Sequence, residues 1–194
     1  MILTMSIYLL STDSMLYGQV GNDSLSSILK NKLESIYDLD QKYRQSSDWQ
    51  MMMKIDSLNQ VELIQILDKY GWLCEDSIGK KASAAIFLVI QHAELPIQEK
   101  YLPIMREAVK KRAARMKDLA LLEDRILMRQ GKKQIYGSQV VKDSKGSWIV
   151  HPIEDPANVD KRRLEIGLIP IKDYLIRMGV IWDLEKHVNA QNEK

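Results

Sequence analysis

The sequence predicts a mainly α-helical domain in which about six helices surround one central apolar helix, together with a single β-hairpin. Apolar residues recur at helical spacing in most segments between residues 25 and 178. Between Gly131 and Pro152 the period changes to the alternation that is typical of strands. At 194 residues, the chain is also long enough for one domain with a substantial core.

The central helix is predicted over residues 79–93. From Ala84 to Ile90 this segment is apolar nearly all round, whereas every other predicted helix carries charges on one side. A helix without a polar face has to be covered by its neighbours. The segment ends in Gln91 and His92, so two polar side chains are expected at the end of a buried helix.

The first predicted helix begins near Leu25, and its apolar stripe continues onto Asp40 and then Arg44. Residues four apart share a face of a helix, so an acid and a base extend the core-facing stripe and are spaced to pair. Two interpretations stay open. Either the helix emerges into solvent at this point, or a partly buried Asp40–Arg44 pair faces a polar cavity.

The other helices are placed by capping residues, prolines and glycines. They are expected at 57–70, at 104–130 in one or two segments, at 156–166 and at 171–178. Ser57 and Gln60 form a capping box at the start of the first of these, and Pro103 suits the first turn of the second. The hairpin is predicted over about residues 134–152 and should lie against the helices, because a lone hairpin is marginal in water.

Three regions are expected along the chain. Residues 1–20 are a candidate signal peptide or a disordered N-terminus. A short apolar run followed by polar residues favours a signal peptide, whereas the lack of a positively charged start opposes one. Residues 21–188 form a single helical domain, and residues 189–194 form a polar tail. An exported (periplasmic or extracellular) and a cytoplasmic location both stay open. No segment is long enough to predict a transmembrane helix.

Composition narrows the classes of partner. The net charge is only +2, and the basic stretch from Arg106 to Lys117 has no interleaved aromatic residues, so no strong nucleic-acid signal is present. Cys74 is the only cysteine, which excludes an intramolecular disulfide and a thiolate metal cluster. His92, His151 and His187 lack ligand-type spacing, so no metal site is predicted, and no cofactor or partner protein can be named.

A set of polar residues lies near the ends of elements that should converge. The candidate catalytic residues are His92, Asp40 and Asp124, and the candidate ligand-binding residues are Arg44, Gln91, Arg125, Gln134, Tyr136, Gln139, Glu154 and Arg163. Arginines of this kind favour an anionic small molecule, such as a phosphate or a carboxylate. The alternative for each residue is a structural role, in which buried hydrogen-bonded pairs fix the ends of helices. Such pairs are expected because an unpaired buried polar group lowers the stability of the fold by about 1–3 kcal/mol.

Three hypotheses about function follow. The first is a binding site for an anionic small molecule. The second is a hydrolase or transferase in which His92 acts as acid and base, oriented by Asp40 or Asp124. The third is a structural or interaction protein in which the polar residues form a buried lock. The sequence does not decide between an enzyme and a binding protein.

Several motifs together resemble an uncharacterised bacterial family that is known only as a domain of unknown function. They are DQKYR (40–44), GW (71–72), QHAE (91–94), EDR (123–125), GKKQIYGSQ (131–139) and PIED (152–155). The resemblance covers about residues 25–175 and implies that these polar motifs belong to one site, but it implies no known reaction. Members often have Asp at the position of Glu94 and Pro at the position of Leu73, and many carry export signals.

Overall fold

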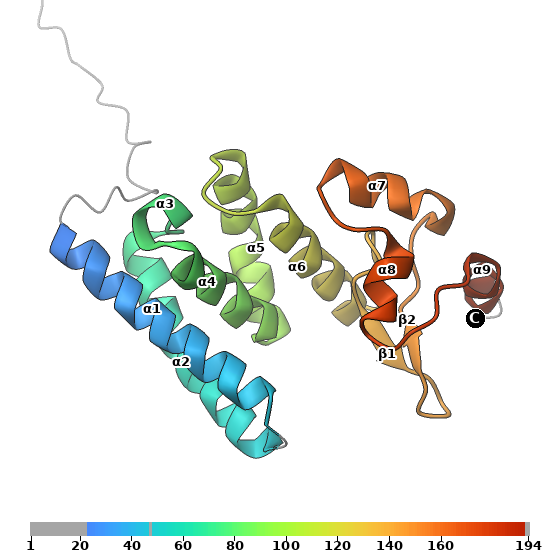
Figure 1. Cartoon of the computed structure of the whole chain (residues 1–194), viewed down its shortest axis with the longest axis horizontal. Helices are drawn as coiled ribbons and strands as arrows, with labels where there is room; N and C mark the ends of the chain where they lie inside the picture. The colour runs from blue at the N-terminus through green and yellow to red at the C-terminus, as the bar shows by residue number, and fades with distance from the viewer. Residues whose placement is uncertain (1–22, 47, 193–194) are drawn as a thin grey trace, which may run out of the picture.

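The segment that is apolar all round forms α4 (Lys80–His92), the central helix of the fold (Figure 1). In the structure, a computed structural model that describes residues 23–46 and 48–192, α4 contacts α1, α2, α3, α5 and α6. Ala85, Ile86 and Ile90 are at most 1% exposed. The prediction of a mainly α-helical fold around this helix, with one hairpin, is therefore confirmed.

Two long antiparallel helices cover one side of α4. They are α1 (Asp23–Arg44) and α2 (Trp49–Tyr70). The expected start of α2 at Ser57 is wrong, because Asp48 already caps the helix by accepting the N–H of Met51 at 2.9 Å. The Ser57 hydroxyl instead donates to the carbonyl of Met53 inside the helix. The expected end is correct, since Gly71 has a φ of 70° and follows the last helical residue.

Three further helices complete this part of the fold: α3 (Glu75–Ile78), α5 (Leu95–Lys110) and α6 (Met116–Arg129). The sequence did not predict α3. The expected start near Pro103 is also wrong, because Pro96 occupies the first turn of α5 and Pro103 lies inside the helix. Both prolines suit a first turn, so the sequence alone does not choose between them. Pro103 is tolerated inside the helix at an exposed position, where the missing N–H removes one backbone hydrogen bond.

The hairpin consists of β1 (Val140–Lys142) and β2 (Trp148–Val150), which pair antiparallel with Val140 opposite Val150. It is shorter than the predicted span of 134–152. Gln134 pairs with Ile153 in an isolated parallel bridge, and the residues between Gln134 and β1 form a loop.

The rest of the chain forms a second, smaller hydrophobic cluster beside the helical part. It contains a short 3-10 helix η2 (Pro156–Asn158) and the helices α7 (Val159–Glu165), α8 (Ile171–Ile176) and α9 (Leu184–Asn192). The buried residues of this cluster include Ile153, Ile171 and Leu175, each with 0% exposure. The sequence did not predict α9, which extends into the residues expected to form a polar tail.

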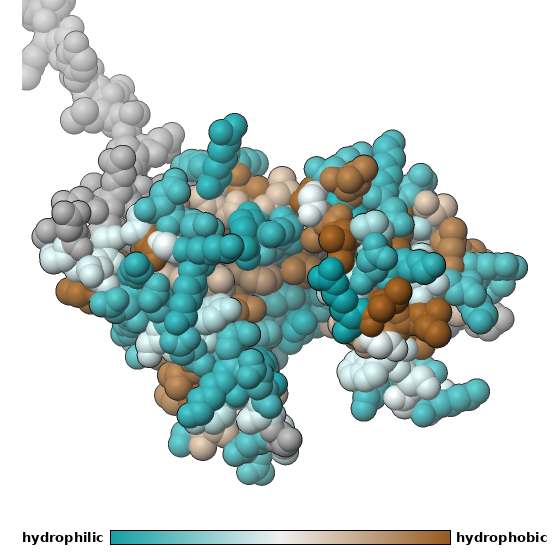
Figure 2. Space-filling view, viewed as in Figure 1, coloured by the Kyte–Doolittle hydropathy of each residue, from teal (hydrophilic) through white to brown (hydrophobic). Residues whose placement is uncertain are grey.

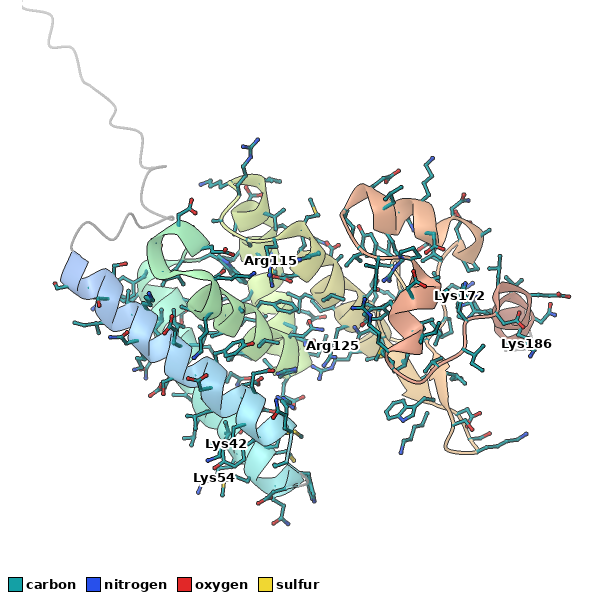
Figure 3. All side chains as sticks on the ribbon, in the orientation of Figure 1. Lys42, Lys54, Arg115, Arg125, Lys172 and Lys186 are labelled. Atoms are coloured by element: carbon teal, nitrogen blue, oxygen red, sulfur yellow. The ribbon has the colours of Figure 1, made fainter. Side chains whose placement is uncertain are left out.

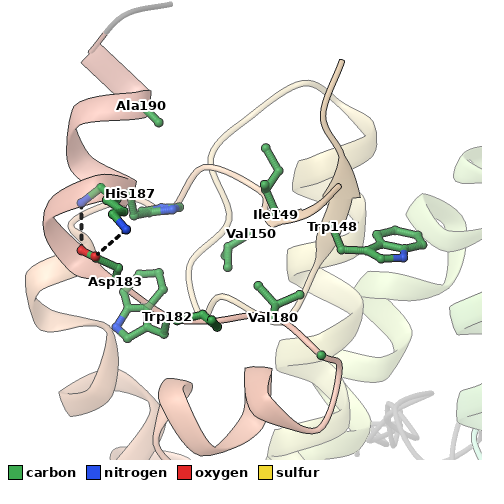
Figure 4. Close-up of a pocket in the computed structure, with 11 residues that line it drawn as sticks. Trp148, Ile149, Val150, Val180, Trp182, Asp183, His187 and Ala190 are labelled. Carbon is green, nitrogen blue, oxygen red and sulfur yellow. Dashed lines mark hydrogen bonds and ion pairs between the residues drawn. The ribbon is translucent and has the colours of Figure 1, made fainter. Parts of the chain in front are cut away.

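A cavity of about 440 Å³ lies between β2 and α9 (Figure 4). Its lining is largely apolar and includes Trp148, Val180 and Trp182, with His187 on the side of α9. The ring of His187 lies against that of Trp182, with 5.0 Å between the ring centroids. Nε2 of His187 also accepts the N–H of Ile153, which follows β2, and α9 contacts η2.

No helix in the described ranges is long and apolar enough to span a bilayer. The candidate signal peptide at residues 1–20 lies outside the residues that the structure describes.

We expect Gly137→Ala to destabilise the fold by about 2–4 kcal/mol. Gly137 has a φ of 70°, and a β-carbon there would lie 2.5 Å from Cδ1 of Ile171 and 2.9 Å from Cδ1 of Ile153. Backbone strain and overpacking would therefore add. Gly146→Ala is the matched control, because Gly146 also has a positive φ of 82° but no neighbouring atom within 4 Å. Urea unfolding of both variants measures the difference, and equal losses would contradict this account.

The stability of the C-terminal part should fall as the pH drops below about 6.5. Burial lowers the pKa of His187, and the charge of His151 acts in the same direction. Nε2 of His187 accepts the N–H of Ile153 at 3.3 Å, which requires the neutral ring. The unfolded chain then binds the proton more readily, so acid favours unfolding. His187→Gln keeps an acceptor that does not titrate, and its melting temperature should change less between pH 7.5 and 5.5. An unchanged pH dependence in this variant would oppose the prediction.

Candidate functional site

The last turn of α1 and the end of α4 bring an acid and an imidazole together. Nδ1 of His92 lies 3.0 Å from Oδ1 of Asp40, and the Asp40 residue is only 2% exposed. Oδ2 of the same carboxylate accepts a hydrogen bond from Nε2 of Gln41 at 2.9 Å. Nε2 of His92 has no hydrogen-bond partner within the described part of the chain. Of the two acids expected to orient His92, Asp40 therefore makes the contact.

Arg44 and Asp56 complete this group. Nη2 of Arg44 lies 3.4 Å from Oδ1 of Asp40, as the spacing on the helix predicted, and it also contacts Asp56 closely. Asp56 was not predicted, because α2 was expected to begin one residue later, at Ser57. A signal was present, since the buried stripe of α2 through Leu63 and Asn59 continues backward onto Asp56.

The environment of Asp40 favours its charged form. Burial is the largest single influence and by itself raises the pKa of this carboxyl, but the hydrogen bond and the charge of His92 oppose burial. Gln41 and Arg44 add to this effect, so the pKa of Asp40 lies below its ordinary value. Asp40 is thus a carboxylate at neutral pH although it is almost wholly buried.

Arg125 on α6 is the centre of a second group. Its Nε donates to Oε1 of Gln139 at 3.1 Å, and its Nη1 donates to the backbone carbonyl of Gln91 at 3.3 Å. No carboxylate forms an ion pair with Arg125 in the described ranges. Burial lowers the pKa of Arg125 to about 10, and the charge of Arg129 acts in the same direction. The side chain is still a cation at neutral pH, with neutral acceptors only.

Arg125 borders a cleft of about 400 Å³ between the helical part and the C-terminal elements (Figure 3). The polar members of the lining are Gln91, Arg125, Ser138 and Gln139, and the apolar and aromatic members are Phe87, Leu88, Leu121, Val140, Trp148, Tyr174 and Met178. Oε1 of Gln91 is buried without a hydrogen-bond partner. Trp148 lines both this cleft and the cavity beneath α9.

The two groups are neighbours at the end of α4. Gln91 and His92 are consecutive residues, and the charge of Arg44 contributes to the lowered pKa of Arg125. The space-filling view shows a hollow between the joined ends of α1 and α2 and the hairpin (Figure 2). The structure therefore brings six predicted residues into two adjoining groups. One group holds Asp40, Arg44 and His92, and the other holds Gln91, Arg125 and Gln139.

Asp124 has a different setting from the one expected for a catalytic acid. It is fully buried, and its carboxylate accepts the backbone N–H groups of Ile135 at 2.7 Å, Tyr136 at 3.0 Å and Ser138 at 2.9 Å. These donors explain why residues 135–138 form a loop rather than the first hairpin strand, because the N–H groups bind a side chain instead of a neighbouring strand. Asp124 thus fixes the loop that carries Gln139.

The side chains of two other predicted ligand-binding residues also form hydrogen bonds with backbone groups. Nε2 of Gln134 donates to the carbonyls of Gln139 at 3.0 Å and His151 at 2.7 Å. Arg163 is 1% exposed, and its Nη1 donates to the carbonyl of Tyr136 at 2.6 Å. Its guanidinium also lies 4.9 Å from the centre of the Tyr174 ring.

Tyr136 and Glu154 contribute backbone atoms to this region. The carbonyl of Tyr136 binds Arg163, and the carbonyl of Glu154 accepts a hydrogen bond from Arg162 at 2.6 Å. The Glu154 side chain is exposed. The sequence pattern placed all of these residues in one site, whereas the structure uses this part of the set to hold the loop against α7 and α8.

Asp124→Asn should destabilise the protein by about 3 kcal/mol or more, because an amide group would face backbone donors that the carboxylate now satisfies. Glu123→Gln is a control on the adjacent residue, which pairs with the half-exposed Arg106 and should lose at most about 1 kcal/mol. Urea unfolding of the two variants tests the difference. A loss for Asp124→Asn as small as that of the control would show that the loop does not depend on this carboxylate.

Comparison with known proteins agrees with the resemblance seen in the motifs. No curated protein and no solved structure matches the chain. The sequence profile of a family of unknown function, DUF6624, matches residues 38–185. That range includes every candidate site residue, from Asp40 to Arg163, and most of the described fold. The chain therefore belongs to the DUF6624 family of proteins of unknown function.

Proposed function

We propose that this protein binds a small molecule with an anionic group in the cleft around Arg125. The observation that carries the proposal is a largely buried guanidinium that borders a cleft and has no carboxylate partner within the described residues. A buried charge that has only neutral hydrogen-bond acceptors is stabilised further when a group of opposite charge binds to it. Guanidinium groups recognise carboxylates and phosphates in a planar, two-point geometry.

The walls of the cleft indicate the rest of the ligand. Phe87, Trp148 and Tyr174 supply aromatic surface, and Gln91 supplies a buried amide oxygen without a partner. This oxygen can accept a hydrogen bond from a donor on the ligand. A volume of about 400 Å³ suits a metabolite of modest size. We therefore infer a ligand with one carboxylate or phosphate, an apolar or planar body and a hydrogen-bond donor.

A thermal-shift screen with pairs of compounds tests this proposal. Each pair contains a carboxylate or phosphate monoester and its neutral amide or ester analogue, so that only the charge differs. The charged member should raise the melting temperature, since a ligand at 100 times its Kd adds about 2.7 kcal/mol of stability. The neutral member should give a much smaller rise.

Arg125→Met should weaken binding of such a ligand by about a hundredfold, because it removes the charge and retains the apolar stem. Arg129→Met is the matched control, since Arg129 is exposed, donates to the carbonyl of Ala93 and does not line the cleft. Calorimetric titration of the best compound measures both variants. Equal affinities of wild type and Arg125→Met for that compound would refute the proposal, as would a screen in which no anionic compound shifts the wild type.

A further inference from the structure

Three side chains with metal-ligating atoms meet beside the proposed anion cleft. They come from three helices: Asp40 from α1, Asp56 from α2 and His92 from α4. One ligand atom from each lies within 4.8 Å of the other two. A six-coordinate ion holds its ligand atoms about 3 Å apart when they are adjacent and about 4.5 Å apart when they are opposite. The spacing of the three ligand atoms is therefore close to that of the ligands around one ion.

The arrangement is supported from outside the group. Gln41 holds the second oxygen of Asp40, so that its first oxygen faces His92 at 3.0 Å. Asp40 is 2% exposed, and the side chain of His92 is 19% exposed. Asp56 is half-buried and gives the group an open side. Buried ligands with one accessible side allow an ion and further ligands to enter.

Arg44 now occupies the position between the two carboxylates. Its Nη2 contacts both Asp40 and Asp56, so a cation already balances part of their charge. The contact to Asp40 is long, at 3.4 Å, and Nε of Arg44 is buried without a partner. The side chain is 25% exposed and can leave toward solvent, where its donors regain water. A doubly charged ion would replace a singly charged group that is incompletely hydrogen-bonded.

We propose that Asp40, Asp56 and His92 bind a divalent transition-metal ion in exchange for the Arg44 guanidinium. One imidazole nitrogen with two carboxylate oxygens suits ions such as Zn²⁺ or Mn²⁺, whereas Ca²⁺ prefers six to eight oxygen ligands. The proposal gives His92 the role of a ligand, which differs from the acid and base role considered from the sequence. It does not depend on the anion cleft, and its test needs no anionic ligand.

Calorimetric titration of the metal-free full chain with Zn²⁺ should show one saturable site. Asp56→Asn should weaken this binding at least tenfold, whereas Asp76→Asn, a change at an exposed acid on α3, should leave it unchanged. Arg44→Met should tighten binding about tenfold, because the competing cation is gone. The two variants should thus change the Zn²⁺ affinity in opposite directions. If the group were only a structural network, the removal of Arg44 would not raise the Zn²⁺ affinity.

Electron spin resonance of bound Mn²⁺ tests the ligands directly. The spin-echo spectrum should contain modulation from an imidazole nitrogen that disappears in His92→Gln. Far-UV circular dichroism of each metal-free variant confirms that it is folded before titration. Two results would overturn the proposal: no saturable binding to either wild type or Arg44→Met, or equal Zn²⁺ affinities of wild type and Asp56→Asn.

Discussion

The buried carboxylate of Asp124 is the interaction on which the rest of the structure depends. Its helix, α6, belongs to the large hydrophobic cluster, and the loop that it binds leads into the small one. This side chain therefore links a helix of the large core to the loop that leads into the small one. The same loop places Gln139 against Arg125 and the carbonyl of Tyr136 against Arg163. The geometry of the cleft is thus a consequence of how three backbone N–H groups are satisfied.

The sequence predicted the elements of the fold better than their ends. The apolar run that forms α4 was expected to be a covered helix, and it is one. The stripe of α1 carries a partly buried Asp40–Arg44 pair, which was one of the two interpretations that the sequence left open. The predicted starts of α2 and α5 were wrong because the sequence offers two suitable starts for each helix. Asp48 and Ser57 can both cap α2, and Pro96 and Pro103 both suit the first turn of α5. Packing of the residues between them decides which one is used, and that information is not local.

The candidate site was predicted in part, for a related reason. The pairing of Asp40 with Arg44 followed from helical spacing, and the approach of His92 followed from the burial of α4. Gln134 and Arg163 were assigned to the same site because a buried polar residue looks alike in sequence whether it binds a ligand or a backbone carbonyl. Only the position of the loop shows that the donors of Gln134 and Arg163 already bind backbone carbonyls. It also shows that Arg125 binds only neutral acceptors, so that its charge has no ionic partner among the described residues.

The position of Trp148 in the wall of two cavities has an optical consequence. One face of the hairpin borders the cleft around Arg125, and the same tryptophan borders the cavity beneath α9. Its indole is 54% exposed, so its fluorescence depends on whatever displaces water from either side. Trp72, in contrast, is 3% exposed in the large core and reports on the integrity of the fold. Among the four tryptophans, Trp148 therefore reports on occupancy of the cleft around Arg125, and Trp72 reports on folding.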